Sequence, residues 1–299
     1  MPGPDRVPVI LFCYNRPVAL RATIAALSAC PEAPETDLFV FVDGPRRDAE
    51  RDKVNAVREV AESAGGFHSV CVQASEKNKG LGPSIIAGVS SVLEQYPSAI
   101  VLEDDLKVTP DFLTYMNEGL ATYRDQPAVF SVCGYTNAVH MPDGYRFDAY
   151  ACPRSSSWGW ATWKDRWVSV DWQPTRESLR KNACRFNRWG GSDCTKMLRD
   201  WMKGKNQSWA IRFCYAQFLQ GKVSVFPVKS LVDPDAGFAG DGTNCHSYSR
   251  FMVEMSGAPK NTFRWPEDLS VLPSVRRQAL HYHSLLLRAW SRIMYLIND

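Results

Sequence analysis

Four short apolar runs alternate with helix-like segments over the first 110 residues, and this order constrains the fold more than any other feature of the chain. The runs are residues 7–13, 38–43, 68–73 and 99–105. Each has the length of a strand and few polar residues, which is typical of strands covered on both faces of a sheet. Because strands that alternate with helices form parallel sheets, we predict an α/β fold with a mostly parallel central sheet and flanking helices.

Polar or glycine-containing segments follow the four runs. They are Asn15-Arg16, Asp43-Gly44, residues 78–82 and residues 103–105. The carboxyl ends of parallel strands meet at one edge of a sheet, where α/β proteins bind their ligands. We therefore expect these segments to converge on one crevice.

The acidic triplet Glu103-Asp104-Asp105 stands directly at the end of the fourth run. Three carboxylates at the end of a buried strand repel one another unless a positive group lies among them. A hard divalent cation, Mg²⁺ or Mn²⁺, shared with the phosphates of a nucleotide meets that need. An alternative interpretation makes the acids a solvated cap for the helix that begins near Asp111.

Composition excludes several classes of protein. At 299 residues the chain can form one large α/β domain or two small ones. A net charge of +3 is too small to indicate a nucleic-acid partner. The nine cysteines have no zinc-ligand spacing, so we interpret them as buried thiols in a reducing compartment. No apolar window reaches the length of a transmembrane helix and no cleavable leader is recognisable, so we predict a cytoplasmic protein.

The second half of the chain has a different character. Residues 125–245 hold most of the ten tryptophans and many turn residues. We expect one helix over residues 208–220 and a strand over residues 222–228. The tryptophans have two interpretations, because such rings can stack on the sugars of an acceptor or simply fill a small core.

Three segments resemble glycosyltransferases of the GT-A fold. IVLEDDLKVTPDFLTYM (residues 100–116) is similar to the metal-binding segment of the Golgi N-acetylglucosaminyltransferase that begins complex N-glycans. Residues 8–27 are similar to the first strand and helix of that family. SSWGWATWKDRW (residues 156–167) resembles its acceptor-side segment and, more closely, a tract of bacterial surface-polysaccharide transferases. The resemblance covers roughly residues 7–245.

This resemblance implies a role for each matching residue in a metal-dependent sugar transfer. Asp105 would ligate Mn²⁺ or Mg²⁺, while Glu103 and Asp104 would face the ribose and sugar of a nucleotide-sugar donor, with a UDP-sugar favoured. Arg16 would approach the diphosphate, and Asp43 would meet the base or ribose. The loop along the nucleotide would contribute Asn78, Lys79 and Gly80. A surface arginine and an ordinary loop before a helix are the alternative interpretations of Arg16 and of this loop.

Less specific patterns in the sequence suggest a catalytic base and a further metal ligand. The helix expected at residues 208–220 has no acid at its start, so the candidates for the base that deprotonates the acceptor are Asp241, Asp200 and Asp193, each with a structural role as the alternative. The pattern assigns no stereochemistry. His246, in the glycine-rich segment 237–246, is a candidate metal ligand, with a surface histidine as the alternative.

Residues 281–297 form a predicted amphipathic helix, with apolar residues on one face and arginines opposite. Such a helix fits an anionic membrane surface, but it also fits packing against its own domain or a partner subunit. We therefore expect a cytoplasmic enzyme, with peripheral contact at the inner face of the membrane as one use of this helix.

The predicted function is transfer of a sugar from a nucleotide diphosphate sugar to a saccharide or lipid-linked glycan acceptor in surface-polysaccharide biosynthesis. We expect a nucleotide-sugar-binding half (residues 1–115), an acceptor-side half (residues 116–265) and a C-terminal helical extension (residues 266–299). One alternative is a sugar-nucleotide pyrophosphorylase, which needs a glycine-rich turn that residues 13–17 lack. The other is a non-catalytic carbohydrate-binding protein, for which a nucleotide crevice would have no use.

Overall fold

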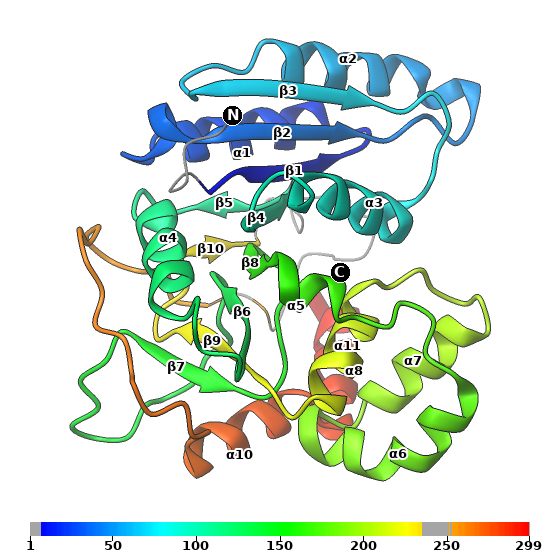
Figure 1. Cartoon of the computed structure of the whole chain (residues 1–299). Helices are drawn as coiled ribbons and strands as arrows, with labels where there is room; N and C mark the ends of the chain where they lie inside the picture. The colour runs from blue at the N-terminus through cyan, green and yellow to red at the C-terminus, as the bar shows by residue number, and fades with distance from the viewer. Residues whose placement is uncertain (1–6, 235–250, 252, 299) are drawn as a thin grey trace.

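An eight-stranded sheet forms the centre of the computed structural model, which describes residues 7–234, 251 and 253–298. Across the sheet the strands are β3 (Ser69–Ala74), β2 (Asp37–Val42), β1 (Val9–Cys13), β4 (Ser98–Glu103), β8 (Trp160–Trp163), β6 (Val129–Cys133), β9 (Val223–Pro227) and β7 (Ala149–Cys152). They run from the top of Figure 1 to near its bottom. Only β8 and β7 oppose the other strands, so the predicted, mostly parallel sheet is confirmed.

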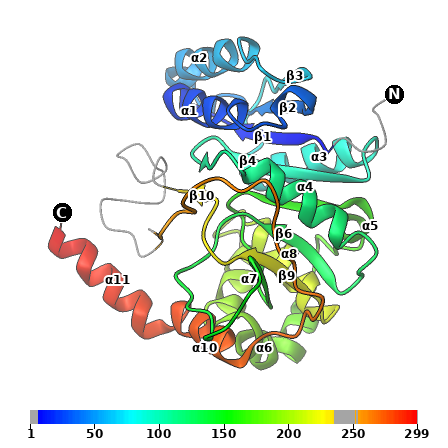
Figure 2. The ribbon, with the colours of Figure 1, turned by 90° about the vertical axis from the view of Figure 1, so that its left-hand side faces the viewer.

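Helices cover both faces of the sheet, and the alternating side chains of β1 show which helices pack on which face. The helices that matter here are α1 (Pro17–Ser28), α2 (Arg51–Glu62), α3 (Leu81–Leu93), α4 (Phe112–Thr122), α5 (Lys164–Val168) and α8 (Ala210–Leu219). Val9 and Leu11 join one core with α1, α2 and α4. Ile10 and Phe12 join a second core with α3, α5 and α8. Accordingly, α1 and α3 lie on opposite sides of β1 in Figure 2.

The rest of the chain adds short elements around this sheet. A two-stranded sheet pairs β5 (Lys107–Val108) with β10 (Val232–Asp233). The 3-10 turns are η1 (Ala33–Glu35) and η2 (Asp48–Glu50), and the further helices are α6 (Arg176–Gly190) and α7 (Cys194–Met202). The helix and strand expected over residues 208–220 and 222–228 are present as α8 and β9.

The predicted C-terminal helix is divided in two. α10 (Pro273–Tyr282) ends where the sequence pattern suggested a start, and α11 (Leu285–Asn298) follows. The hydroxyl of Ser284 accepts a hydrogen bond from the backbone N–H of Leu287 at 3.2 Å, which caps the new helix and explains the break. No helix in the described residues combines the length and the apolar character needed to cross a bilayer.

Three tryptophans, on β8 and on the neighbouring helical segments, fill the hydrophobic core. The ring of Trp160 stacks on those of Trp209 and Trp167, with centroids 4.7 and 5.7 Å apart, and Phe213 packs against the same ring. All four side chains are buried. The core-filling interpretation therefore holds for these tryptophans, whereas Trp158, which is half-buried, lines a pocket.

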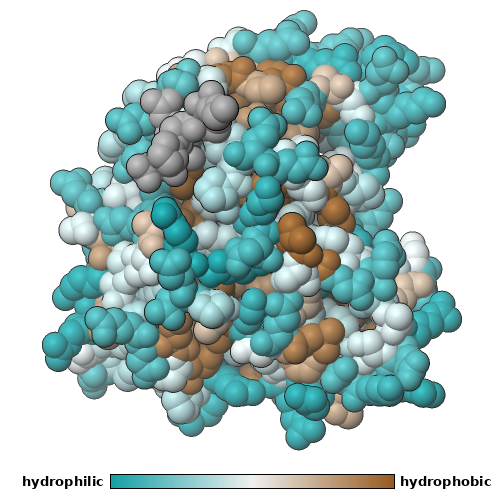
Figure 3. Space-filling model, in the orientation of Figure 1, coloured by the Kyte–Doolittle hydropathy of each residue, from teal (hydrophilic) through white to brown (hydrophobic). Residues whose placement is uncertain are grey.

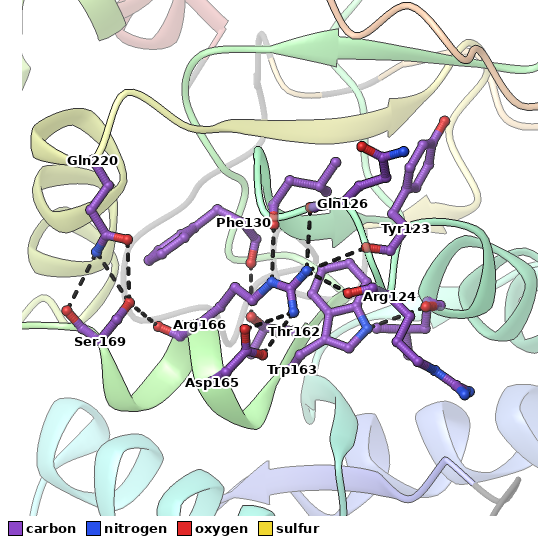
Figure 4. A network of polar contacts seen from close by, with 12 residues as sticks. Tyr123, Arg124, Gln126, Phe130, Thr162, Trp163, Asp165, Arg166, Ser169 and Gln220 are labelled. Atoms are coloured by element: carbon purple, nitrogen blue, oxygen red, sulfur yellow. Dashed lines mark hydrogen bonds and ion pairs between the residues drawn. The ribbon is translucent and has the colours of Figure 1, made fainter.

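Arg166, from the same tryptophan-rich segment, ties α5 to the connection between α4 and β6 (Figure 4). Its guanidinium donates to the carbonyl oxygens of Arg124 at 2.7 Å and Gln126 at 3.2 Å, and it pairs with the carboxylate of Asp165 at 2.8 Å. It also lies 4.5 Å from the ring centroid of Trp163. A buried arginine with this many partners holds the fold together. The side chain of Arg166 is therefore not available to contact an acceptor.

Candidate active site

One pocket of about 1050 Å³ lies at the carboxyl ends of β1, β2, β3 and β4. This volume is just above the range of about 300–1000 Å³ that is usual for small-molecule sites. All four segments that follow these strands contribute to its wall, so the predicted convergence on one crevice is observed. The sequence-predicted residues on the wall are Arg16, Asp43, Asn78, Lys79, Glu103, Asp104 and Asp105.

Arg16 bridges two of the three acids at the end of β4. Its guanidinium donates to Asp104 Oδ1 at 2.6 Å and to Asp105 Oδ2 at 2.9 Å. The other oxygen of Asp104 accepts from the backbone N–H of Tyr14 at 3.2 Å. The α1 N-terminus is thereby fastened to the end of β4. Arg16 is consequently an organising residue of the acidic cluster, in addition to any contact with a donor.

Glu103 and Asp104 resist ionisation in this arrangement. Burial, together with the neighbouring carboxylates of Asp105 and Asp104, raises the pKa of Glu103 to about 8. Burial also raises the pKa of Asp104, to about 6, although the charge of Arg16 acts in the opposite direction. Part of this resistance is mutual repulsion among the three carboxylates, which a cation bound beside them would relieve.

Asp43 holds the loop that leads into α3. Its two carboxylate oxygens accept hydrogen bonds from the backbone N–H groups of Lys79 and Gly80, both at 2.9 Å. The side-chain amide of Asn78 donates to the carbonyl of Gly44 at 2.8 Å. These contacts join the ends of β2 and β3, so Asp43 and Asn78 shape the pocket wall through backbone contacts.

Gly80 is required by the path of this loop. Its φ is +79°, and a Cβ atom there would lie 2.1 Å from Gln207 Oε1. At Gly82 a Cβ atom would lie 2.1 Å from the carbonyl oxygen of Gln207. Glycine at both positions thus lets the loop pack against the segment before α8.

Some pocket residues had no role in the sequence analysis. The hydroxyl of Tyr14 donates to Glu50 Oε2 at 2.6 Å and accepts from the N–H of Arg46 at 3.1 Å. The Arg46 guanidinium lies 5.3 Å from the Tyr14 ring centroid. Tyr14 could have been found, because it adjoins the end of the first apolar run. Glu50 lies eight residues beyond the end of β2, and no local pattern distinguishes it.

Comparison with known proteins identifies the family. Residues 9–200 match the family described as glycosyl transferase family 2. The chain belongs to this family. A search of curated protein sequences found no match.

Two solved structures are similar to this glycosyl transferase family 2 chain. The mannosyltransferase PcManGT from Pyrobaculum calidifontis, in complex with GDP-Man and Mn²⁺, is 14% identical, with a TM-score of 0.38 over 73% of this chain and 76% of that chain. TarS from S. aureus is 12% identical, with a TM-score of 0.36 over 75% of this chain and 35% of that chain.

Membership of glycosyl transferase family 2 confirms the predicted GT-A glycosyltransferase. It decides between the functional alternatives, because sugar transfer is the activity for which the family is named. The pyrophosphorylase and the carbohydrate-binding protein are therefore set aside.

The acidic cluster fits a divalent cation in a family 2 transferase. No group of three His, Cys, Asp or Glu side chains surrounds a metal position in residues 7–234, 251 and 253–298. Mg²⁺ is usually held by one or two carboxylates, with water and substrate phosphates completing its shell, and the acidic cluster offers carboxylates on the pocket wall. Asp105 is suited to this use because its half-buried side chain lies on the pocket wall.

Asp200 is a predicted site residue that the structure does not bring into the pocket. Asp200 lies on α7, where it pairs with Lys196, and it lines neither of the two described pockets. Asp193, another candidate for the base, is buried and forms an ion pair with the half-buried Arg154 at 2.9 Å. Asp241 and His246 lie outside the described residues.

Proposed function

We propose that this chain transfers a sugar from a nucleotide diphosphate sugar, with UDP as the favoured nucleotide, to a saccharide acceptor in a reaction that depends on Mn²⁺ or Mg²⁺. The observation that carries the proposal is the Glu103-Asp104-Asp105 cluster, bridged by Arg16, on the wall of a pocket large enough for a nucleotide sugar. Membership of glycosyl transferase family 2 supports the reaction class.

Asp105 is proposed as the metal ligand, with Asp104 and Glu103 facing the ribose and sugar of the donor. When bound, the cation would neutralise charge on the departing nucleotide diphosphate. Arg16 would keep Asp104 in place and approach the diphosphate of the donor. The raised pKa of Glu103 suits a group that donates a hydrogen bond to a sugar hydroxyl or carbonyl.

The other donor contacts follow the pocket wall. Asp43 and the loop of Asn78, Lys79 and Gly80 are proposed to lie along the base and ribose, since Asp43 holds that loop at the pocket. Tyr14 adds an aromatic ring on the same wall, fixed by its hydrogen bond to Glu50. An aromatic ring in this place can stack on a nucleobase.

The acceptor is proposed to be a saccharide or lipid-linked glycan of surface-polysaccharide biosynthesis, reached from the cytoplasmic side of the membrane. Trp158 lines both the main pocket and an adjoining cavity of about 240 Å³, so it can contact an acceptor sugar beside the donor. Asp241 is proposed as the base that deprotonates the acceptor hydroxyl, because Asp200, the alternative, lies away from the pocket. His246 is proposed as a second metal ligand.

Calorimetric titration of UDP into the protein, with and without Mn²⁺, tests the core of this proposal. We expect binding that requires the metal and is lost in Asp105→Ala. Asp125→Ala is the matched control, since Asp125 is an exposed aspartate outside both pockets. Failure of both UDP and GDP to bind in the presence of metal would overturn the nucleotide-sugar proposal, and binding of GDP alone would correct the nucleotide.

A further inference from the structure

The outward face of α11 is its apolar face. The side chains of Leu285, Leu286 and Ile293 are 66%, 82% and 54% exposed, respectively. Leu287 and Arg288, which lie around the helix from them, are half-buried. A helix on the surface of a water-soluble protein normally has the reverse arrangement, with its apolar stripe inward. Figure 2 shows that α11 leads away from α10 along the edge of the molecule.

Such a concentration of exposed apolar side chains is peculiar to α11 within the described residues. Half of the large apolar side chains that are exposed there belong to this one helix. The others, Val18, Leu81, Val168 and Leu219, are spread over four different helices. The face shown in Figure 3 is mainly hydrophilic, with small separate hydrophobic patches, as expected for a surface in water.

Positive charge is concentrated in the segment of the chain that contains this helix. Residues 269–298 contain Arg276, Arg277, Arg288 and Arg292 and no aspartate or glutamate. Without these four, the 35 lysines and arginines of the chain become 31, against 32 acids. The net positive charge of the protein therefore resides entirely in the segment that carries the exposed apolar helix. Arg276 and Arg277, on α10, are themselves exposed.

We propose that α11, together with the basic pair on α10, docks on an anionic phospholipid surface, with the helix lying in the plane of the membrane. An apolar helix face with nearby arginines binds such surfaces through burial among the lipid chains and attraction to acidic headgroups. With 14 residues the helix is about 21 Å long, which suits a helix in the plane of the interface. The same positive charge opposes pairing of this face with a second copy of itself.

Vesicle co-sedimentation of the full-length protein tests this proposal without donor, metal or acceptor. We expect binding to vesicles of phosphatidylglycerol mixed with phosphatidylcholine, weaker binding in high salt, and little binding to phosphatidylcholine alone. Leu286→Glu should lower the partition coefficient at least about tenfold, because it removes a large apolar group from the buried face. Arg276→Glu with Arg277→Glu should abolish the preference for anionic lipid.

Val168→Glu is the matched control, because it places the same charge on another helix at a site that is 72% exposed. It should bind vesicles as the wild type does. The proposal is overturned if the wild type ignores anionic vesicles, or if Leu286→Glu and Val168→Glu bind equally. A dimer in solution that Leu286→Glu dissociates, without vesicle binding, would assign the face to a second copy instead. None of these outcomes depends on nucleotide binding, so they leave the proposed function untouched.

Discussion

The guanidinium of Arg16 lies 2.6 Å from the Asp104 carboxylate, although 88 residues separate them in the sequence. This pair joins the start of α1 to the end of β4, and only 3% of the Asp104 side chain is exposed to water. The acidic cluster thus depends on a cation that belongs to the protein itself. The consequences are measurable in the absence of any metal.

Replacement of Arg16 should destabilise the protein. In Arg16→Ala the buried Asp104 loses its ion-pair partner, and we expect a loss of about 3 kcal/mol in the free energy of unfolding. Urea denaturation in the presence of a chelator measures this difference. Arg21→Ala, an exposed arginine on the same helix, should change stability by less than about 0.5 kcal/mol. Equal stability of Arg16→Ala and the wild type would mean that the bridge contributes nothing.

Addition of a single methyl group at Gly80 should lower the stability of the protein and weaken nucleotide binding. Gly80→Ala places a side chain at a positive φ, so we expect a loss of about 1 kcal/mol in stability. The added methyl group also displaces the end of the Gln207 side chain, so we expect weaker nucleotide binding. Gly144→Ala is the control, since Gly144 has a φ of +78° and nothing within 4 Å of the added carbon. Backbone strain is therefore common to both variants. If the two behave alike, the contact with Gln207 has no effect on the site.

A cluster at the opposite end of β2 should give the protein a pH-dependent stability. Asp37 accepts hydrogen bonds from Ser69 at 2.5 Å, His68 at 2.7 Å and Tyr96 at 2.9 Å. Although burial acts to raise it, these hydrogen bonds hold the pKa of Asp37 below its usual value. A carboxyl with a depressed pKa stabilises the folded state above its unfolded pKa of about 4, and that contribution is lost as the pH falls through the folded value.

Asp37→Asn is therefore expected to cost about 1–3 kcal/mol at pH 7. The difference from the wild type should shrink below about pH 4, as the wild type also becomes protonated. Thermal or urea unfolding at a series of pH values measures both. A difference that stays constant down to the acid transition would show that the Asp37 charge has no part in the stability.

The Arg166 network should be among the most sensitive parts of the second half of the chain. Arg166→Ala leaves the buried carbonyl groups of the connection between α4 and β6 without their donor, so we expect a cost of about 3 kcal/mol. Arg166→Lys should recover only part of this, because an ammonium group cannot reach several carbonyls at once. Arg51→Ala removes an exposed arginine with one ion pair and serves as the comparison in urea denaturation.

Local sequence patterns predicted the first half of this fold well. Continuous apolar runs report strands buried on both faces, and the topology of a parallel sheet brings their carboxyl ends together without further information. The position of the acidic triplet on the pocket wall follows from that topology alone. α6 was missed although Leu179, Phe186 and Gly190 recur on one buried face, because its many charged residues obscured a short apolar stripe.

Tertiary structure decided what each side chain of these segments contacts. Trp158 lines a pocket while Trp160, two residues further, is buried in the core, because the turn at Gly159 (φ +59°) separates the pocket wall from β8. Arg16 likewise pairs with Asp104, and no repeating pattern in the sequence links two positions so far apart. The spacing of apolar residues indicates which face of a helix or strand is buried. The partner on that face depends on packing between elements that are distant in the sequence.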